Sequence, residues 1–99
     1  MESYWSATKA GTNSGATATK AAQDNRMYVV TAVSGHVDAD SVITVKDGTT
    51  IVWESKVDIS IEGTSFHFAG LNLACRMGNK AEGALASSSS DCQITISGI

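Results

Sequence analysis

Apolar and polar residues alternate along several short stretches of the chain, with the period of two that is typical of half-buried β-strands. The stretch Val57–Glu62 alternates along its whole length, and Cys92–Ser97 repeats the pattern near the end of the chain. Ser65–Phe68 places two phenylalanines on one face and His67 on the other. We therefore predict that these three stretches are strands of antiparallel sheets with one covered face.

The segment Val42–Trp53 contains two runs rich in β-branched residues on either side of Asp47-Gly48. Because an Asp-Gly pair tolerates the positive φ angles of a type I′ turn, this segment is predicted to be a β-hairpin. A strand is expected over Arg26–Val37 before it, central in its sheet because its first half is apolar on both faces. Asp38–Ser41 is predicted to turn the chain from this strand into the hairpin.

Two alanine-rich segments are ambiguous between helix and strand. Thr17 and Thr19 interrupt the first as a helix, and Gly83 with the serine run that follows it interrupts the second. We therefore expect strands over Gly15–Lys20 and Ala84–Ser88. Residues 76–83 are predicted to form the longest loop.

The expected elements amount to seven or eight short strands at spacings of about 8–12 residues, which is typical of sandwiches and jelly rolls. The predicted fold class is all-β, an antiparallel, jelly-roll-like β-sandwich over residues 15–99. Residues 1–14 are rich in Gly, Ser, Thr and Asn and carry Tyr4 and Trp5. We expect them to form an N-terminal arm that either folds back over the sandwich or reaches out to a partner.

Composition narrows the classes of function. Charged residues make up 17% of the 99 residues, against about 25% in average soluble proteins, and Ser and Thr supply much of the polar surface instead. With a net charge of −3 and scattered Lys and Arg residues, binding to nucleic acid through phosphate contacts is not expected. Apolar runs long enough to span a membrane and a secretory signal are both missing from the sequence, so we expect synthesis in a cytosol.

No catalytic or metal-binding motif is recognisable in the sequence. His36, Asp38 and one of many serines could be combined into a triad, but no serine lies in a GxSxG turn. The pair Asp38 and Asp40 has the spacing that begins a calcium loop, yet Ile43 and Thr49 occupy the positions of its glycine and glutamate. We expect no enzyme activity, no cofactor and no metal site.

The two cysteines are expected to be structural. Cys75 and Cys92 are not in a CxxC pair and have no cluster of His or Asp beside them. They could form a disulfide only from adjacent strands, which a cytosolic origin disfavours. We expect two free, packed thiols.

The aromatic residues are candidates for binding. Trp53, which alternates with Ile51 after the hairpin turn, is expected in the core, whereas Trp5 is expected to be exposed on the arm. Tyr and Trp dominate the energetics of protein interfaces, so Tyr4 and Trp5 are the candidate partner contacts. Two aromatics on a shared exposed face could instead stack on sugar rings.

The layout of the chain resembles the small decoration or cement proteins of tailed bacteriophage capsids. The pieces that carry the resemblance are a Val-rich strand ending near a glycine, an Asp-Gly hairpin ending in Trp, an aromatic strand, and a final strand ending in Gly. Here these are Tyr28–Gly35, Ile43–Trp53, Phe66–Gly70 and Cys92–Gly98. The resemblance implies a compact jelly-roll-like domain, usually trimeric, on the outer capsid where capsomers meet, without enzymatic activity.

On this basis we expect a non-enzymatic virion structural protein that is made in the host cytoplasm and stabilises the capsid surface. Its expected partners are the major capsid protein and other copies of itself in a homotrimer, with no nucleic acid and no membrane. The alternative is a carbohydrate- or receptor-binding β-sandwich, such as a lectin-like or fibre-tip domain.

Overall fold

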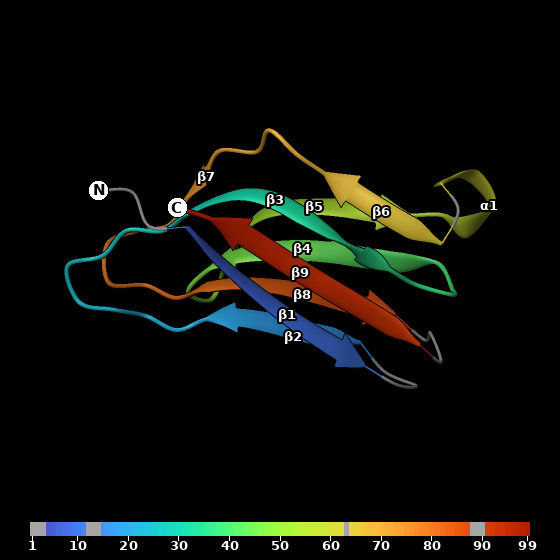
Figure 1. Ribbon diagram of the computed structural model, residues 1–99, viewed down its shortest axis with the longest axis horizontal. Coiled ribbons are helices and arrows are strands. Elements are labelled where there is room, and N and C mark those ends of the chain that lie inside the picture. Colours follow the sequence, from blue (N-terminus) through green and yellow to red (C-terminus); the bar gives the residue numbers. More distant parts are fainter. Residues whose placement is uncertain (1–3, 12–14, 63, 88–90) are drawn as a thin grey trace.

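The computed structural model describes residues 4–11, 15–62, 64–87 and 91–99. In these residues the chain forms nine β-strands in two antiparallel sheets, which pack face to face as a sandwich (Figure 1). The elements are β1 (Trp5–Gly11), β2 (Ala16–Lys20), β3 (Val29–His36), β4 (Ser41–Asp47), β5 (Thr50–Val57), the helical turn α1 (Ile59–Glu62), β6 (Ser65–Phe68), β7 (Leu73–Ala74), β8 (Ala81–Ser87) and β9 (Cys92–Gly98). The predicted all-β sandwich is confirmed.

The strand order is that of a jelly roll. Sheet A has the order β1-β9-β3-β6, with the short β7 also paired to β3, and sheet B has the order β2-β8-β4-β5. Apart from β7, the strands pair from the outside of the sequence inward: β1 with β9, β2 with β8, β3 with β6 and β4 with β5. Such nested antiparallel pairs arise when one long hairpin is rolled up, as in the two-sheet jelly roll.

The core lies between the sheets and follows the alternation along the strands. Ile94 and Ile96 of β9 belong to the same core as Ile43 and Val45 of β4, and all four side chains are fully buried. Gly83 of β8 lies against the two β9 isoleucines, because a Cβ atom there would lie 2.3 Å from Cγ2 of Ile96. A residue without a side chain therefore lets the β9 side chains approach the backbone of sheet B.

The predicted hairpin is confirmed, but its turn lies one residue further on. Asp47 pairs with Thr50, so the two loop residues are Gly48 and Thr49. Only Gly48 has a positive φ, 64°, which is the pattern of a type II′ turn and not of type I′. The Asp47 carboxylate accepts hydrogen bonds from the Arg76 backbone N–H (3.1 Å) and from the side-chain amide of Asn79 (2.8 Å), which fixes Asp47 in the strand.

The strand predicted over 57–62 is wrong beyond Val57, because the chain turns into α1 there. The Asp58 carboxylate accepts hydrogen bonds from the backbone N–H (3.0 Å) and the hydroxyl (2.6 Å) of Ser60. Asp40, which lies between β3 and β4, accepts a hydrogen bond from the backbone N–H of Ile59 (3.1 Å). The first N–H groups of a helical turn have no acceptor within the turn, and these carboxylates supply one. In an extended strand the same N–H groups would bond to a neighbouring strand.

The expectation of an N-terminal arm is wrong for residues 5–11, which belong to the sandwich. Trp5–Gly11 is strand β1, and all seven residues pair with β9. Residues 1–3 and 12–14 of that prediction lie outside the described residues. The sandwich therefore includes residues from both sides of the expected boundary at position 15.

The other strand predictions hold with small changes of length. The strand expected over 26–37 is β3, the aromatic stretch is β6, and the C-terminal stretch is β9. The two alanine-rich segments are strands β2 and β8, although Ser88 lies outside the described residues. Because β8 begins at Ala81, the loop predicted over 76–83 is shorter than expected.

Candidate functional site

The outer face of sheet A is the most distinctive surface of the molecule. Along β9 the outward side chains alternate with buried isoleucines, and the register aligns them with outward side chains of β1, β3 and β6. The outward residues form three rows: Ser6, Ser97 and Ala32; Thr8, Thr95, Ser34 and His67; Ala10, Gln93, His36 and Ser65. None of these described positions carries Asp, Glu, Lys or Arg.

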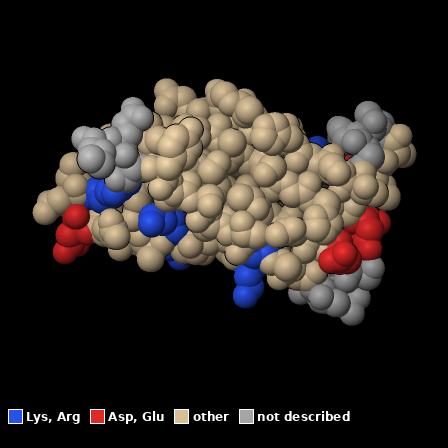
Figure 2. Space-filling model, viewed as in Figure 1, with Lys and Arg blue, Asp and Glu red and all other residues tan. Residues whose placement is uncertain are grey.

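Figure 2 shows this face. Charged side chains lie at the two ends and along the lower rim, and the broad middle of the face is uncharged. The hydroxyls of Thr8 and Thr95 are hydrogen-bonded to each other (2.8 Å), which links two neighbouring strands across the surface. The face therefore presents hydroxyl, amide and imidazole groups that both donate and accept hydrogen bonds.

Such a face is inexpensive to cover. Removing an uncharged hydroxyl or amide from water costs much less than removing a charge, provided that a hydrogen-bond partner replaces the water. Lys, Glu and Asp are depleted in the buried cores of protein interfaces, and so are Ser and Ala, which make up six of the eleven outward residues here. The absence of Asp, Glu, Lys and Arg from the rows therefore lowers the cost of covering this face, which makes it the candidate contact surface of the molecule.

The two predicted contact residues occupy different environments. Tyr4 is 81% exposed, whereas Trp5 is only 7% exposed and packs edge-on against Tyr28, with their ring centroids 5.5 Å apart. The expectation of an exposed Trp5 is wrong, because the alternation of β1 turns Trp5 and Ala7 inward. Trp53 is half-buried against Phe68 (5.1 Å between centroids), at the border of the core in which we expected it.

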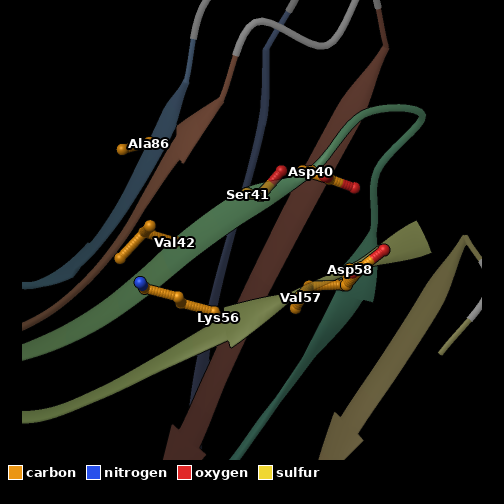
Figure 3. Close-up of a pocket in the computed structure, with 7 residues that line it drawn as sticks. All are labelled: Asp40, Ser41, Val42, Lys56, Val57, Asp58 and Ala86. Carbon is orange, nitrogen blue, oxygen red and sulfur yellow. The ribbon is translucent and has the colours of Figure 1, made fainter. Parts of the chain in front are cut away.

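Sheet B has an open depression on its outer face. Its volume is about 350 Å³, and Figure 3 shows the residues that line it: Asp40, Ser41, Val42, Lys56, Val57, Asp58 and Ala86. Hydrogen bonds from the hydroxyl and the backbone N–H of Ser60 hold the pKa of Asp58 below its ordinary value. Asp58 is therefore a carboxylate at neutral pH, and it lines the same depression as the apolar side chains of Val42 and Ala86.

The remaining candidates for chemistry do not form a site in the part of the chain that the structure describes. No three His, Cys, Asp or Glu residues come together there to hold a metal ion. His36 lies 3.9 Å from the carboxylate of Asp91, and both side chains are largely exposed. No helix among the described segments combines the length and apolar character needed to cross a bilayer.

The two cysteines are buried thiols that form no disulfide with each other, as expected from the sequence. Burial and the nearby charge of Asp47, in that order, raise the pKa of the Cys75 thiol. A buried thiol with a raised pKa is a poor nucleophile at neutral pH, because the thiolate is the reactive form.

Sequence reasoning identified two of the four polar faces that make up the sheet A surface, those of β6 and β9, and did not combine them. The alternation in β6 and β9 indicated the outward residues His67 and Thr95. The row-by-row alignment of these residues with Ser34 of β3 and Thr8 of β1 depends on the strand order, which alternation does not encode.

These features define the class of the chain, a jelly-roll β-sandwich with one uncharged outer face. Comparison with protein-family models, with curated proteins and with solved structures gives no match to it.

Proposed function

We propose that this chain is a non-enzymatic virion structural protein, which decorates and stabilises a phage capsid as an oligomer, a homotrimer. The observation that carries the proposal is the outer face of sheet A, whose three in-register rows contain no Asp, Glu, Lys or Arg. The proposed occupant of this face is the major capsid protein.

The fold is compatible with this role but does not select it. Jelly rolls occur in viral capsid domains, and also in lectins and cupins, so function must be argued from the surface. The absence of charge from this face supports a contact with another protein. The resemblance of the sequence layout to capsid decoration proteins supports the same partner.

The composition of the face also supports an oligomer. Aromatic and Arg residues supply most of the strong contacts in protein interfaces, and the three rows contain neither. One copy is therefore expected to bind weakly. Several linked copies bind far more tightly than one, because each contact after the first is intramolecular.

The carbohydrate-binding alternative finds less support. Sugar stacking needs aromatic rings on a shared exposed face, but Tyr28 is fully buried, Trp5 is nearly so, and Trp53 is half-buried against Phe68. We therefore expect that the protein binds no sugar of a glycan array through Tyr4, its exposed aromatic residue. A sugar bound in the array and lost in Tyr4→Ala would favour the alternative.

The proposal is tested with one substitution on each sheet. Thr95 and Thr44 are half-buried, outward threonines on central strands of sheets A and B. Thr95→Lys should lower the affinity for DNA-free phage heads at least tenfold, because it places a charge without a partner in the proposed contact. Thr44→Lys is the matched control and should bind like the unaltered protein.

Co-sedimentation with the heads measures both affinities. Equal binding by Thr95→Lys and the unaltered protein would contradict the proposal. So would a selective loss in Thr44→Lys, since it would assign the contact to sheet B.

A further inference from the structure

The large exposed apolar side chains gather at one end of the sandwich. Backbone hydrogen bonds join the segments that form this end: Gly78 N–H to Arg26 O (2.9 Å), Ile99 N–H to Val29 O (3.0 Å) and Gly48 N–H to Lys80 O (3.0 Å). The C-terminal end of the chain and the start of β1 lie here as well (Figure 1). We call it the apolar end, after its exposed residues Tyr4, Met27, Ile51, Val52, Met77 and Ile99.

The apolar end is also the basic end. Five of the seven Lys and Arg residues lie on its loops and strand ends: Lys20, Arg26, Lys46, Arg76 and Lys80. The acidic residues placed with them are Asp24, Asp47 and Glu82. Glu82 pairs with both Lys46 (3.9 Å) and Lys80 (3.1 Å), and the Asp47 carboxylate is bound to the loop that carries Arg76. Positive charge is left in excess at this end.

The opposite end is acidic and contains the depression on sheet B. Four carboxylates lie on its loops, those of Asp38, Asp40, Asp58 and Asp91, with Lys9 and Lys56 on the nearby strands. Figure 2 shows the larger acidic group at the right-hand end of the molecule. The molecule is 41 Å long, so the two ends are separated by several Debye lengths, each about 8 Å at physiological salt, and act as independent surfaces.

We propose that the apolar end of one copy docks into the sheet B depression of a second copy, in a head-to-tail contact. This inference deepens the self-association contained in the proposed function and rests on it. The two ends are opposite in net charge, although Lys56 is among the residues that line the depression. Each end also combines its charged groups with apolar side chains that the other copy covers.

The loop at Met77 is the best-shaped element for insertion. Met77 is 64% exposed, and it lies between Arg76 and Gly78, whose φ of 84° forms the turn. Methionine fills irregular apolar spaces well, because its side chain is unbranched and flexible. With Met77 against Val42 and Ala86, the neighbouring Arg76 guanidinium reaches the carboxylates of the depression, where charge-assisted hydrogen bonds form.

A contact between two different surfaces has a definite consequence for assembly. Head-to-tail association closes into a ring when the rotation between copies allows it and otherwise continues as an open chain. A closed ring of three copies would carry three sheet A faces. Three linked faces bind the capsid more tightly than one weakly binding face, because the second and third contacts are intramolecular.

The test uses one variant on each surface and a control. Met77→Asp removes the apolar insert, and Ala86→Arg fills the depression with a cation. Thr17→Arg is the control, because Thr17 is an exposed strand residue of β2 that lies on neither docking surface and outside the sheet A rows. Sedimentation velocity over a wide range of concentrations should show association of the unaltered protein and the control, and at least tenfold weaker association of each variant. Higher salt should weaken association.

Mixing the two variants tests the head-to-tail geometry directly. Met77→Asp retains an intact depression and Ala86→Arg retains an intact apolar end, so an equimolar mixture should form one-to-one dimers that grow no further. A mixture that stays monomeric, or an unaltered protein that is monomeric throughout, would overturn the inference. Binding of such monomers to heads through sheet A, sensitive to Thr95→Lys, would leave the proposed capsid contact standing and contradict only the homotrimer.

Discussion

Single residues show where this sandwich tolerates change and where it does not. Gly83 has no space for a side chain, since its Cβ would lie 2.3 Å from Cγ2 of Ile96 in the core. Gly83→Val should therefore lower the free energy of unfolding by about 1–3 kcal/mol, the typical cost of overpacking. Urea denaturation measures the change.

Ala84→Val is the control for this prediction, because Ala84 is the next residue of β8 and faces outward. We expect it to change stability little, since valine suits an exposed strand position. Equal losses in the two variants would show that the sheets are not closely packed at Gly83.

Asp58 gives a prediction about pH at the same scale. Its pKa is lowered first by the hydroxyl of Ser60 and then by the backbone N–H of Ser60. Because the folded pKa lies below the ordinary value of about 3.9, the stabilising contribution is present above that pH. It is lost as the pH falls through the folded pKa.

NMR titration of the Asp58 carboxyl carbon tests the cause of this shift. In Ser60→Ala we expect the Asp58 pKa to rise toward its ordinary value, because the strongest hydrogen bond is gone. A midpoint that does not move in this variant would exclude the hydroxyl as the main cause.

In addition to strand pairing and the core, a few polar contacts join distant elements of the sandwich. Asp47, at the end of β4, accepts hydrogen bonds from Arg76 and Asn79, so it joins the hairpin to the loop before β8. Asp47→Ala leaves both donors without this acceptor and should cost about 1–3 kcal/mol. It should also speed the labelling of Cys75 by a thiol reagent, which mass spectrometry localises.

Asp47→Asn separates the two effects of the carboxylate on this thiol. It removes the charge that contributes to the raised pKa of Cys75 but retains an oxygen acceptor for the loop. We expect a smaller increase in labelling than in Asp47→Ala. Slow labelling in both variants would mean that Asp47 does not hold the loop in place.

The elements also show how far the sequence determines the fold. Strands β6 and β9 and the hairpin were predictable because alternation and turn residues are local signals. The helical turn α1 was not, since Asp40 contributes its hydrogen bond to Ile59 from 19 residues away. Strand β1 was hidden by a loop-like composition, and it is a strand because it pairs with β9, more than eighty residues later.

At the scale of the whole molecule, the strand order brings the outward polar side chains of separate strands together in continuous surfaces. The nested pairing places β1, β9, β3 and β6 side by side, so that Thr8, Thr95, Ser34 and His67 become one row. The same topology sends most of the basic loops to one end and most of the acidic turns to the other. Neither surface was predictable from the sequence, because each combines residues that only the topology brings together.

The central claim is that the outer face of sheet A is the surface that meets the capsid. A cryo-EM reconstruction of DNA-free heads decorated with the protein tests it most directly. We predict that the row containing Ser34 and Thr95 contacts the major capsid protein while the outer face of sheet B points away from the shell. Bound copies that contact the shell through sheet B, with the sheet A rows open to solvent, would contradict the account.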